Sequence, residues 1–329
     1  MNIYDIAKEA GVSISTVSRV LNNKGNVNDQ TRKKVEEVLK KNNYTPSAIA
    51  RGMVSKSMRT IAVLTVDIRV PHYATTAYII ERECSKKGYE VLLCNTGGEK
   101  KETEKYLTIV LEKHVDGIIF VGSIFNTICE DKRIKRLLGK VPMVVANGTL
   151  QMENAYSILV NDKGGISLMV RHLVEKGHKH IYYVKDMDTM SARLKCEGFV
   201  QCMKECGLEA EANNVIETES SIDGGRMVVK ILQKEKKKVT AIICGEDITA
   251  AGVVKELLQQ GIQVPNDVAV TGYNNSQYAR ICQPQLTTVD NKPELVATLS
   301  VKLLTDLIEK KENSDCYVIE PEIVLGETT

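Results

Sequence analysis

The chain has 329 residues, with 44 Lys and Arg against 42 Asp and Glu, which leaves a net charge of only +2. Seven prolines and no low-complexity run exclude long tails. Nine cysteines without a Cys-x-x-Cys pair predict free thiols in a reducing cytoplasm rather than a disulfide framework. No signal peptide and no apolar run of membrane length is visible, so we expect a cytoplasmic protein without a membrane partner.

The first predicted element is a pair of short helices in residues 5–22, DIAKEAGVSISTVSRVLN. Apolar residues recur at the spacing of one helical face, stop at Gly11, and resume at Val17. Gly11 can take the positive φ that ends the first helix, and the Ser13 side chain can cap the second. This pattern predicts a helix-turn-helix, whose second helix can lie in a DNA major groove.

The second helix presents polar residues once its apolar face is turned inward. Arg19 can pair with guanine through two hydrogen bonds, Ser or Thr can bond a base or a phosphate, and Ile14 can touch a thymine methyl group. An ordinary helical hairpin with solvated Ser and Thr is the alternative for this stretch alone. The candidate DNA-binding residues of the helix and its end are Ile14, Ser15, Thr16, Ser18, Arg19 and Asn22.

Basic residues are concentrated in the same part of the chain. Residues 1–60 contain eleven Lys or Arg and five acids, whereas residues 61–329 contain 33 basic and 37 acidic residues. Lys and Arg that neutralise phosphates release counterions, which gives affinity for any DNA sequence and makes binding weaken as salt rises. A charge run is usually a solvated face, but its coincidence with the helix-turn-helix favours double-stranded DNA as a partner.

A third helix is predicted after Asn28, which can serve as its cap. Residues 1–45 are therefore expected to form a small three-helix headpiece, which would be only marginally stable by itself. The inward stripe of the third helix consists of Val35, Val38 and Leu39.

A linker is predicted over residues 46–59, beginning at Pro46. The segment contains helix-forming residues but has little to bury, so we expect it to become ordered only with a partner. Met53 could insert between base steps in the minor groove and kink the duplex. A plain linker is the alternative.

From residue 60 onward, short apolar runs rich in Val and Ile alternate with helical stretches. Apolar strands that alternate with helices predict parallel sheets covered on both faces. Residues 60–329 are too many for one such layer, so we expect two α/β lobes. The predicted strands lie in TIAVLTVDI, YEVLLCN, VDGIIFVG, VPMVVAN, SILVN, HIYYVKD, VTAIICG and DVAVTGY.

Polar residues follow several of these strands, at the carboxyl ends where α/β folds bind ligands. No nucleophile and base can be paired, and neither a G-x-G-x-x-G nor a Walker loop is present, so we expect neither an enzyme nor a cofactor. An enzyme or a pure ligand carrier on the same core is the alternative class. No metal is expected, because Cys202 and Cys206 have no His or acid at ligand spacing. The polar residues are Asp67, Ser123, Asn147, Glu246, Asp247 and Asn274.

The chain resembles the LacI/GalR family of bacterial transcription regulators along nearly its whole length. Each similar segment is weak alone, but their order and spacing are very specific. The segments are IYDIAKEAGVSISTVSRVLN, TRKKV, NYTPSAIARGM, VDGIIF, the GH after VEKG, SARLKCEGF, VPNDVAVTGY and PQLTTV.

The resemblance implies a DNA headpiece, a hinge helix that forms on the operator, and a core like the type I periplasmic sugar-binding proteins. In that core, three crossovers would join an N-lobe (60–161 and 290–329) to a C-lobe (162–289). The family also implies a repressor that binds a pseudo-palindromic operator as a homodimer, with Arg19 among the residues that read the major groove and Met53 as the wedge. No leucine heptad follows to build a tetramer.

The resemblance fails at the effector pocket. Sugar-binding members have Asp where this chain has Asn147, and Arg where it has Lys195. They have Asn-Asp where it has Glu246-Asp247, and Asp where it has Asn274. Lys does not replace the forked Arg that grips hydroxyls or a carboxylate with paired bonds. The candidate effector-binding residues are Asp67, Tyr73, Ser123, Asn147, Lys195, Glu246 and Asn274.

Two interpretations of the pocket remain open: it binds nothing, or it binds a changed ligand. Lys195 and Glu246 could pair in an empty cleft and hold the lobes together. A ligand would instead offer an amine to Glu246 or an anion to Lys195. The headpiece also resembles the catabolite-control branch of the family, so control by a corepressor protein rather than a small molecule is the alternative.

Overall fold

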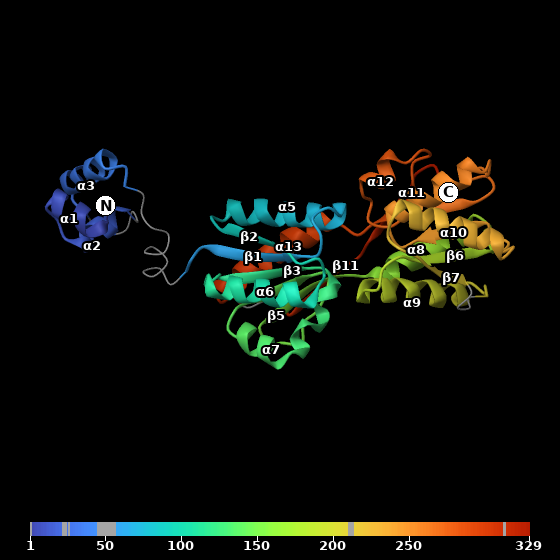
Figure 1. Ribbon diagram of the computed structural model, residues 1–329, viewed down its shortest axis with the longest axis horizontal. Helices are drawn as coiled ribbons and strands as arrows, with labels where there is room; N and C mark the ends of the chain where they lie inside the picture. Colours follow the sequence, from blue (N-terminus) through green and yellow to red (C-terminus); the bar gives the residue numbers. More distant parts are fainter. Residues whose placement is uncertain (1, 22–24, 26, 45–56, 210–213, 312–313) are drawn as a thin grey trace. The chain divides into compact units, whose positions relative to one another are not determined.

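The computed structural model describes residues 2–21, 25, 27–44, 57–209, 214–311 and 314–329. The chain divides into two compact units, Met1–Arg59 and Thr60–Thr329 (Figure 1). Most of the predicted linker, including Met53, lies outside the described residues, as does Asn22.

The first unit is the predicted three-helix headpiece. Helix α1 (Ile3–Ala10) begins with a capping box, in which Asn2 Oδ1 accepts from Asp5 N at 3.1 Å and Asp5 Oδ2 accepts from Asn2 N at 2.9 Å. It ends at Gly11, whose φ of 63° is the left-handed conformation expected at this turn. The helices α2 (Ile14–Leu21) and α3 (Asp29–Lys41) complete the headpiece.

The headpiece is held by a small apolar core. Asn28 caps α3 through Gln30 N, and Ser13 Oγ accepts from Thr16 N at the start of α2, so both predicted caps are present. The buried core residues are Ile6, Ala7, Ala10, Val17, Val20 and Val35.

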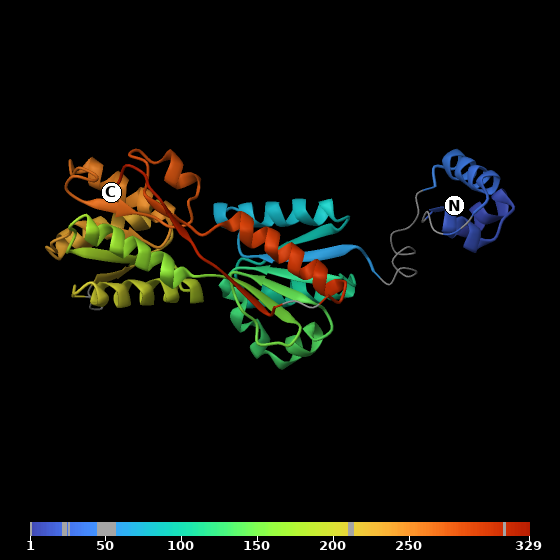
Figure 2. The same cartoon turned by 180° about the vertical axis from the view of Figure 1, so that it is seen from behind.

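The second unit contains two parallel sheets, each covered by helices on both faces. The N-lobe sheet has the strand order β11-β5-β4-β3-β1-β2. Helices α5 (Pro71–Lys86) and α13 (Pro293–Ile308) cover one face, as Figures 1 and 2 show, and α6 (Lys100–Glu112) and α7 (Lys132–Leu138) pack on the other. A 3₁₀ helix, η1 (Ser123–Glu130), follows β3. The strands are β1 (Thr60–Thr65), β2 (Glu90–Asn95), β3 (Gly117–Val121), β4 (Met143–Ala146), β5 (Ala155–Val160) and β11 (Cys316–Ile319).

The C-lobe repeats this architecture with the strand order β7-β6-β8-β9. Helices α8 (Asp162–Glu175) and α9 (Met190–Glu205) pack on one face, and α10 (Ile222–Lys234) and α11 (Asp247–Gln259) on the other. A short helix, α12 (Gln277–Ile281), follows β9. The strands are β6 (Ile181–Lys185), β7 (Val215–Glu217), β8 (Ala241–Cys244) and β9 (Ala269–Thr271).

The end of the chain returns to the C-lobe after β11 (Figure 2). Strand β12 (Glu322–Val324) pairs antiparallel with β10 (Thr288–Asp290), and Val270 N donates to Thr328 O at 3.0 Å. Residues 322–329 are thus hydrogen-bonded to segments next to or within the C-lobe, although the family resemblance implies that all of residues 290–329 belong to the N-lobe.

No helix among the described residues combines the length and apolarity needed to cross a membrane. The described cysteine side chains are free thiols, namely those of Cys84, Cys94, Cys196, Cys202, Cys206, Cys244, Cys282 and Cys316.

Candidate functional site

Helix α2 presents the predicted DNA-binding residues on the face opposite the headpiece core. Val17 and Val20 are buried, whereas Ile14 is 40% exposed. Ser15 and Arg19 are exposed, and Thr16 and Ser18 are partly exposed. A single exposed isoleucine is common on protein surfaces, and at the start of this helix it is suited to contact with a thymine methyl group.

Hydroxyl groups are clustered at the start of α2. Ser13 Oγ lies 2.7 Å from Ser15 Oγ and 2.9 Å from Thr16 Oγ1. The cluster fixes these side chains at the helix N-terminus, where phosphate oxygens are favoured by the free backbone N–H groups. A role in DNA binding for these residues stays a prediction, because no DNA is present.

Six of the seven predicted effector-binding residues line one small cavity, of about 40 Å³, between the two lobes. Asp67 does not line it. The Asp67 carboxylate instead pairs with Arg69 Nη2 at 2.7 Å, which lowers the pKa of Asp67. The six residues that line the cavity are Tyr73, Ser123, Asn147, Lys195, Glu246 and Asn274.

Lys195 and Glu246 form an ion pair inside the cavity wall. Lys195 Nζ lies 3.5 Å from Glu246 Oε1, donates to Gly245 O at 2.9 Å, and sits 3.8 Å from the centre of the Tyr273 ring. The second oxygen of Glu246 accepts from Asn274 Nδ2. The pair lies within the C-lobe, so it does not hold the two lobes together as the sequence suggested.

The contacts that cross between the lobes come from other residues. Ser191 N, at the start of α9, donates to Ser123 Oγ of the N-lobe at 3.2 Å. Ser191 Oγ in turn donates to Asp162 Oδ2, and Asp162 Oδ1 accepts from Tyr273 OH at 2.7 Å. This chain of hydrogen bonds connects the N-lobe to the wall of the cavity.

Asp186 is a cavity residue that the sequence analysis missed. It follows β6 directly and is 6% exposed, and its Oδ1 lies against Gly245, where an added Cβ would be only 2.5 Å away. Burial raises the pKa of Asp186, and the Thr249 side chain and the charge of Lys195 oppose the shift. The position after the predicted strand HIYYVKD is the signal that could have identified it.

Burial also alters the other ionisable groups of the cavity. It raises the pKa of Glu246 to about 8; Lys195 opposes this shift, and Asp186 and Asp247 add to it. Burial lowers the pKa of His72 to about 4, which keeps this imidazole neutral at pH 7. Burial raises the pKa of Tyr73 as well.

Four buried polar atoms of the cavity lining have no hydrogen-bond partner among the described residues. Buried polar atoms normally find a partner, so these atoms indicate a place for a ligand or water. They are His72 Nδ1, Tyr183 OH, Asp186 Oδ2 and Asn291 Oδ1.

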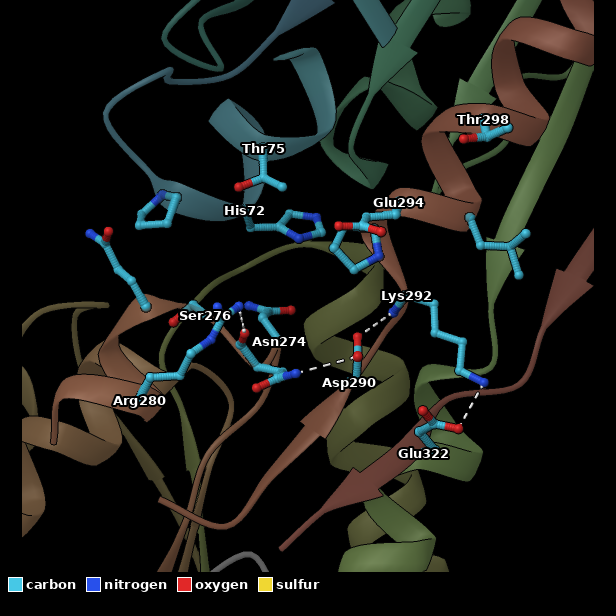
Figure 3. Close-up of a pocket in the computed structure, with 15 residues that line it drawn as sticks. His72, Thr75, Asn274, Ser276, Arg280, Asp290, Lys292, Glu294, Thr298 and Glu322 are labelled. Atoms are coloured by element: carbon cyan, nitrogen blue, oxygen red, sulfur yellow. Dashed lines mark hydrogen bonds and ion pairs between the residues drawn. The ribbon is translucent and has the colours of Figure 1, made fainter. Parts of the chain in front are cut away.

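A larger pocket of about 680 Å³ adjoins the cavity and shares His72 and Asn274 with it (Figure 3). The two cations that line this pocket have separate partners. Lys292 Nζ pairs with Glu322 Oε2 at 3.0 Å, and Arg280 Nη2 donates to the backbone oxygen of Asn275 at 3.5 Å. No group of three or more potential metal ligands occurs among the residues described.

Comparisons with known proteins agree with this architecture. Residues 2–47 match the family model of bacterial regulatory proteins, lacI family, and residues 170–329 match the periplasmic binding protein-like domain. The chain is 32% identical to an HTH-type transcriptional regulator of Lachnoclostridium phytofermentans, over 100% of this chain and 99% of that protein. It is also 32% identical to catabolite control protein A of Priestia megaterium, over 97% and 96%.

The fold is that of the lac repressor dimer bound to operator and the anti-inducer ONPF, with a TM-score of 0.89 and 24% identity over 100% of this chain and 98% of that one. A helix-turn-helix headpiece joined to a core of this kind defines a DNA-binding transcription regulator. The chain belongs to the lacI family of bacterial regulatory proteins.

Proposed function

We propose that the chain is a repressor that acts as a homodimer on a pseudo-palindromic operator, in the cytoplasm, and that it regulates transcription rather than catalysing a reaction. The observation that carries this proposal is the exposed face of α2, which places Ile14, Ser15 and Arg19 opposite the buried Val17 and Val20. Two such helices in a dimer would meet two half-sites, one helical turn of DNA apart or a multiple of it.

Ligand control of the core is the second part of the proposal. The cavity between the lobes and its unpartnered polar atoms support a small molecule as the signal. A corepressor protein is the other candidate, and it is favoured only by similarity to catabolite control protein A. The chain is 32% identical both to catabolite control protein A and to the Lachnoclostridium regulator, so sequence identity does not decide between a small molecule and a corepressor protein.

Selection of bound sequences from random duplex DNA, followed by fluorescence anisotropy at two salt concentrations, tests the DNA-binding part. We expect a motif with two-fold symmetry and an affinity that falls steeply with salt, because Lys and Arg of the headpiece release counterions. Failure to enrich any motif would contradict the proposal. Sedimentation of the complex tests the dimer, and a stable tetramer at micromolar concentration would reject it.

A further inference from the structure

The cavity between the lobes contains more carboxyl groups than cations. Asp186 and Glu246 both line it, and Lys195 is the one Lys or Arg among its described lining residues. Burial raises the pKa of both carboxyl groups, although Lys195 lowers each of them. One ammonium group therefore does not keep both buried carboxyl groups ionised at pH 7, and a second cation in the cavity would favour loss of the proton from Glu246.

Lys195 has little left to offer an anionic ligand. An ammonium group has three N–H donors, and that of Lys195 already has Gly245 O, Glu246 Oε1 and the face of the Tyr273 ring around it. A phosphate or carboxylate would have to displace Glu246 and would then lie beside Asp186. The structure thus disfavours an anion, one of the two ligands open from the sequence.

Two of the four unpartnered atoms of the cavity can only accept a hydrogen bond: Asn291 Oδ1, and Asp186 Oδ2 while Asp186 is ionised. Tyr183 OH can donate or accept, and the role of Nδ1 of the neutral His72 depends on its tautomer. Asp186 is 6% exposed, and burial raises its pKa although Thr249 and Lys195 oppose the shift, so its unpartnered Oδ2 favours a donor. The space of about 40 Å³ holds ~3 water molecules or one small head group.

We propose that this cavity recognises an amine: the ligand places an ammonium group against Asp186 and Glu246 and donates a further hydrogen bond to Asn291. The inference rests on the proposed function, since it takes the cavity to be where the regulator senses its ligand. The adjoining pocket agrees with a cationic ligand, because it adds the carboxylates of Asp290, Glu294 and Glu322 against Arg280 and Lys292.

Thermal-shift titration of the full chain at pH 7.5 tests the proposal with matched probes. Methylammonium is compared with methanol, and D-glucosamine with D-glucose and D-glucose 6-phosphate. We expect both amines to raise the melting temperature more than their neutral counterparts, and the phosphate to have no effect. The proposal is overturned if neither amine stabilises the chain beyond its neutral partner, or if glucose or its phosphate binds more tightly.

Two substitutions locate the amine. Asp186→Asn keeps the size of the side chain but removes its charge, so amine affinity should fall about 10- to 100-fold. Asp188→Asn is the matched control, because Asp188 lies two residues further on and its side chain is 72% exposed. Glu246→Gln provides a second test if Asp186→Asn lowers stability without ligand. Equal amine affinity in wild type, Asp186→Asn and Glu246→Gln would place the amine elsewhere.

Operator binding is measured on the same samples without added amine. If the wild type does not bind the operator specifically, the proposed function is contradicted, but the amine result remains valid. Specific DNA binding without amine selectivity would overturn only the inference about the ligand.

Discussion

The headpiece and the cavity differ in how their residues are brought together. In the headpiece, most of the candidate DNA-contacting residues belong to a single eight-residue helix, and Ser13, which caps its first turn, directly precedes it. In the cavity, the lining residues come from several segments between His72 and Asn291. Single changes should therefore act locally in the headpiece and couple to the fold of both lobes in the cavity.

The largest effect is expected from Lys195→Met, which removes the one Lys or Arg among the described residues that line the cavity. Removing one partner of a buried ion pair leaves an uncompensated charge and costs ~3–5 kcal/mol. We expect the free energy of unfolding of the core, measured by chemical denaturation, to fall by at most this amount at pH 8, where Glu246 is only partly ionised. The cost should be smaller at pH 6, where Glu246 can take up a proton.

Lys101→Met is the control for this change, since Lys101 is exposed on α6 and surface lysines contribute little to stability. If Lys195→Met lowers stability no more than Lys101→Met at pH 8, Lys195 does not stabilise the carboxyl groups of the cavity.

A smaller effect, confined to DNA binding, is expected from Arg19→Ala. A bidentate contact to guanine is worth ~1–3 kcal/mol of discrimination, so preference for the selected operator over random DNA should fall about 5- to 150-fold. The free energy of unfolding should barely change, because Arg19 is exposed. Fluorescence anisotropy with both DNAs measures the ratio.

Lys40→Ala provides a matched loss of charge, from the exposed surface of α3. It should weaken binding to both DNAs equally, since a general charge effect carries no sequence information. An unchanged operator preference in Arg19→Ala would show that Arg19 does not read bases.

Much of the fold is predictable from the sequence because local signals specify it. The Gly11 turn, the caps at Ser13 and Asn28, and the eight apolar runs that become strands all rest on short-range patterns. The strands β7 and β10 were not predicted, because each has only three residues and too few apolar positions to show a pattern.

The cavity is predictable only in part. The rule that strand ends carry ligand groups placed Ser123, Asn147, Glu246 and Asn274 in it, but the same rule gave Asp67, which Arg69 draws into a local ion pair. The pairing of residues 322–329 with the C-lobe could not be predicted either, because it depends on hydrogen bonds between segments far apart in the sequence, such as the one from Val270 N to Thr328 O.

The pH dependence of stability should distinguish the cavity from the headpiece. The folded-state pKa of Glu246 is raised to about 8 from 4.5, so between these values the folded state holds a proton that the unfolded state has lost. Stability contributed by Glu246 is therefore lost as pH rises through this window, at up to ~1.4 kcal/mol per pH unit. Burial of His72 acts in the opposite direction below pH 6.5, because its pKa is lowered to about 4.

The variant Glu246→Gln isolates the contribution of Glu246 to the pH dependence of stability. The difference in free energy of unfolding between wild type and Glu246→Gln, measured by denaturation from pH 7 to pH 8, cancels the contribution of the histidines. We expect the wild type to lose stability relative to the variant as pH rises. A difference that does not vary with pH would show that Glu246 is ionised throughout.

The smallest effect is expected from Asn2→Ala, which removes the cap of α1. Asn2 Oδ1 accepts from Tyr4 N at 2.9 Å and from Asp5 N at 3.1 Å, so both donors lose their partner. Because these groups are exposed, water replaces part of the loss, and the cost should be ~0.5–1 kcal/mol. Amide hydrogen exchange in the full chain should then show protection of residues 3–10 reduced about 2- to 5-fold, with no change in the strands of the core. Asn2→Ser is the matched control, since serine caps a helix nearly as well, and protection should return to the wild-type level. Equal loss in Asn2→Ala and Asn2→Ser would mean that the Asn2 cap does not stabilise α1.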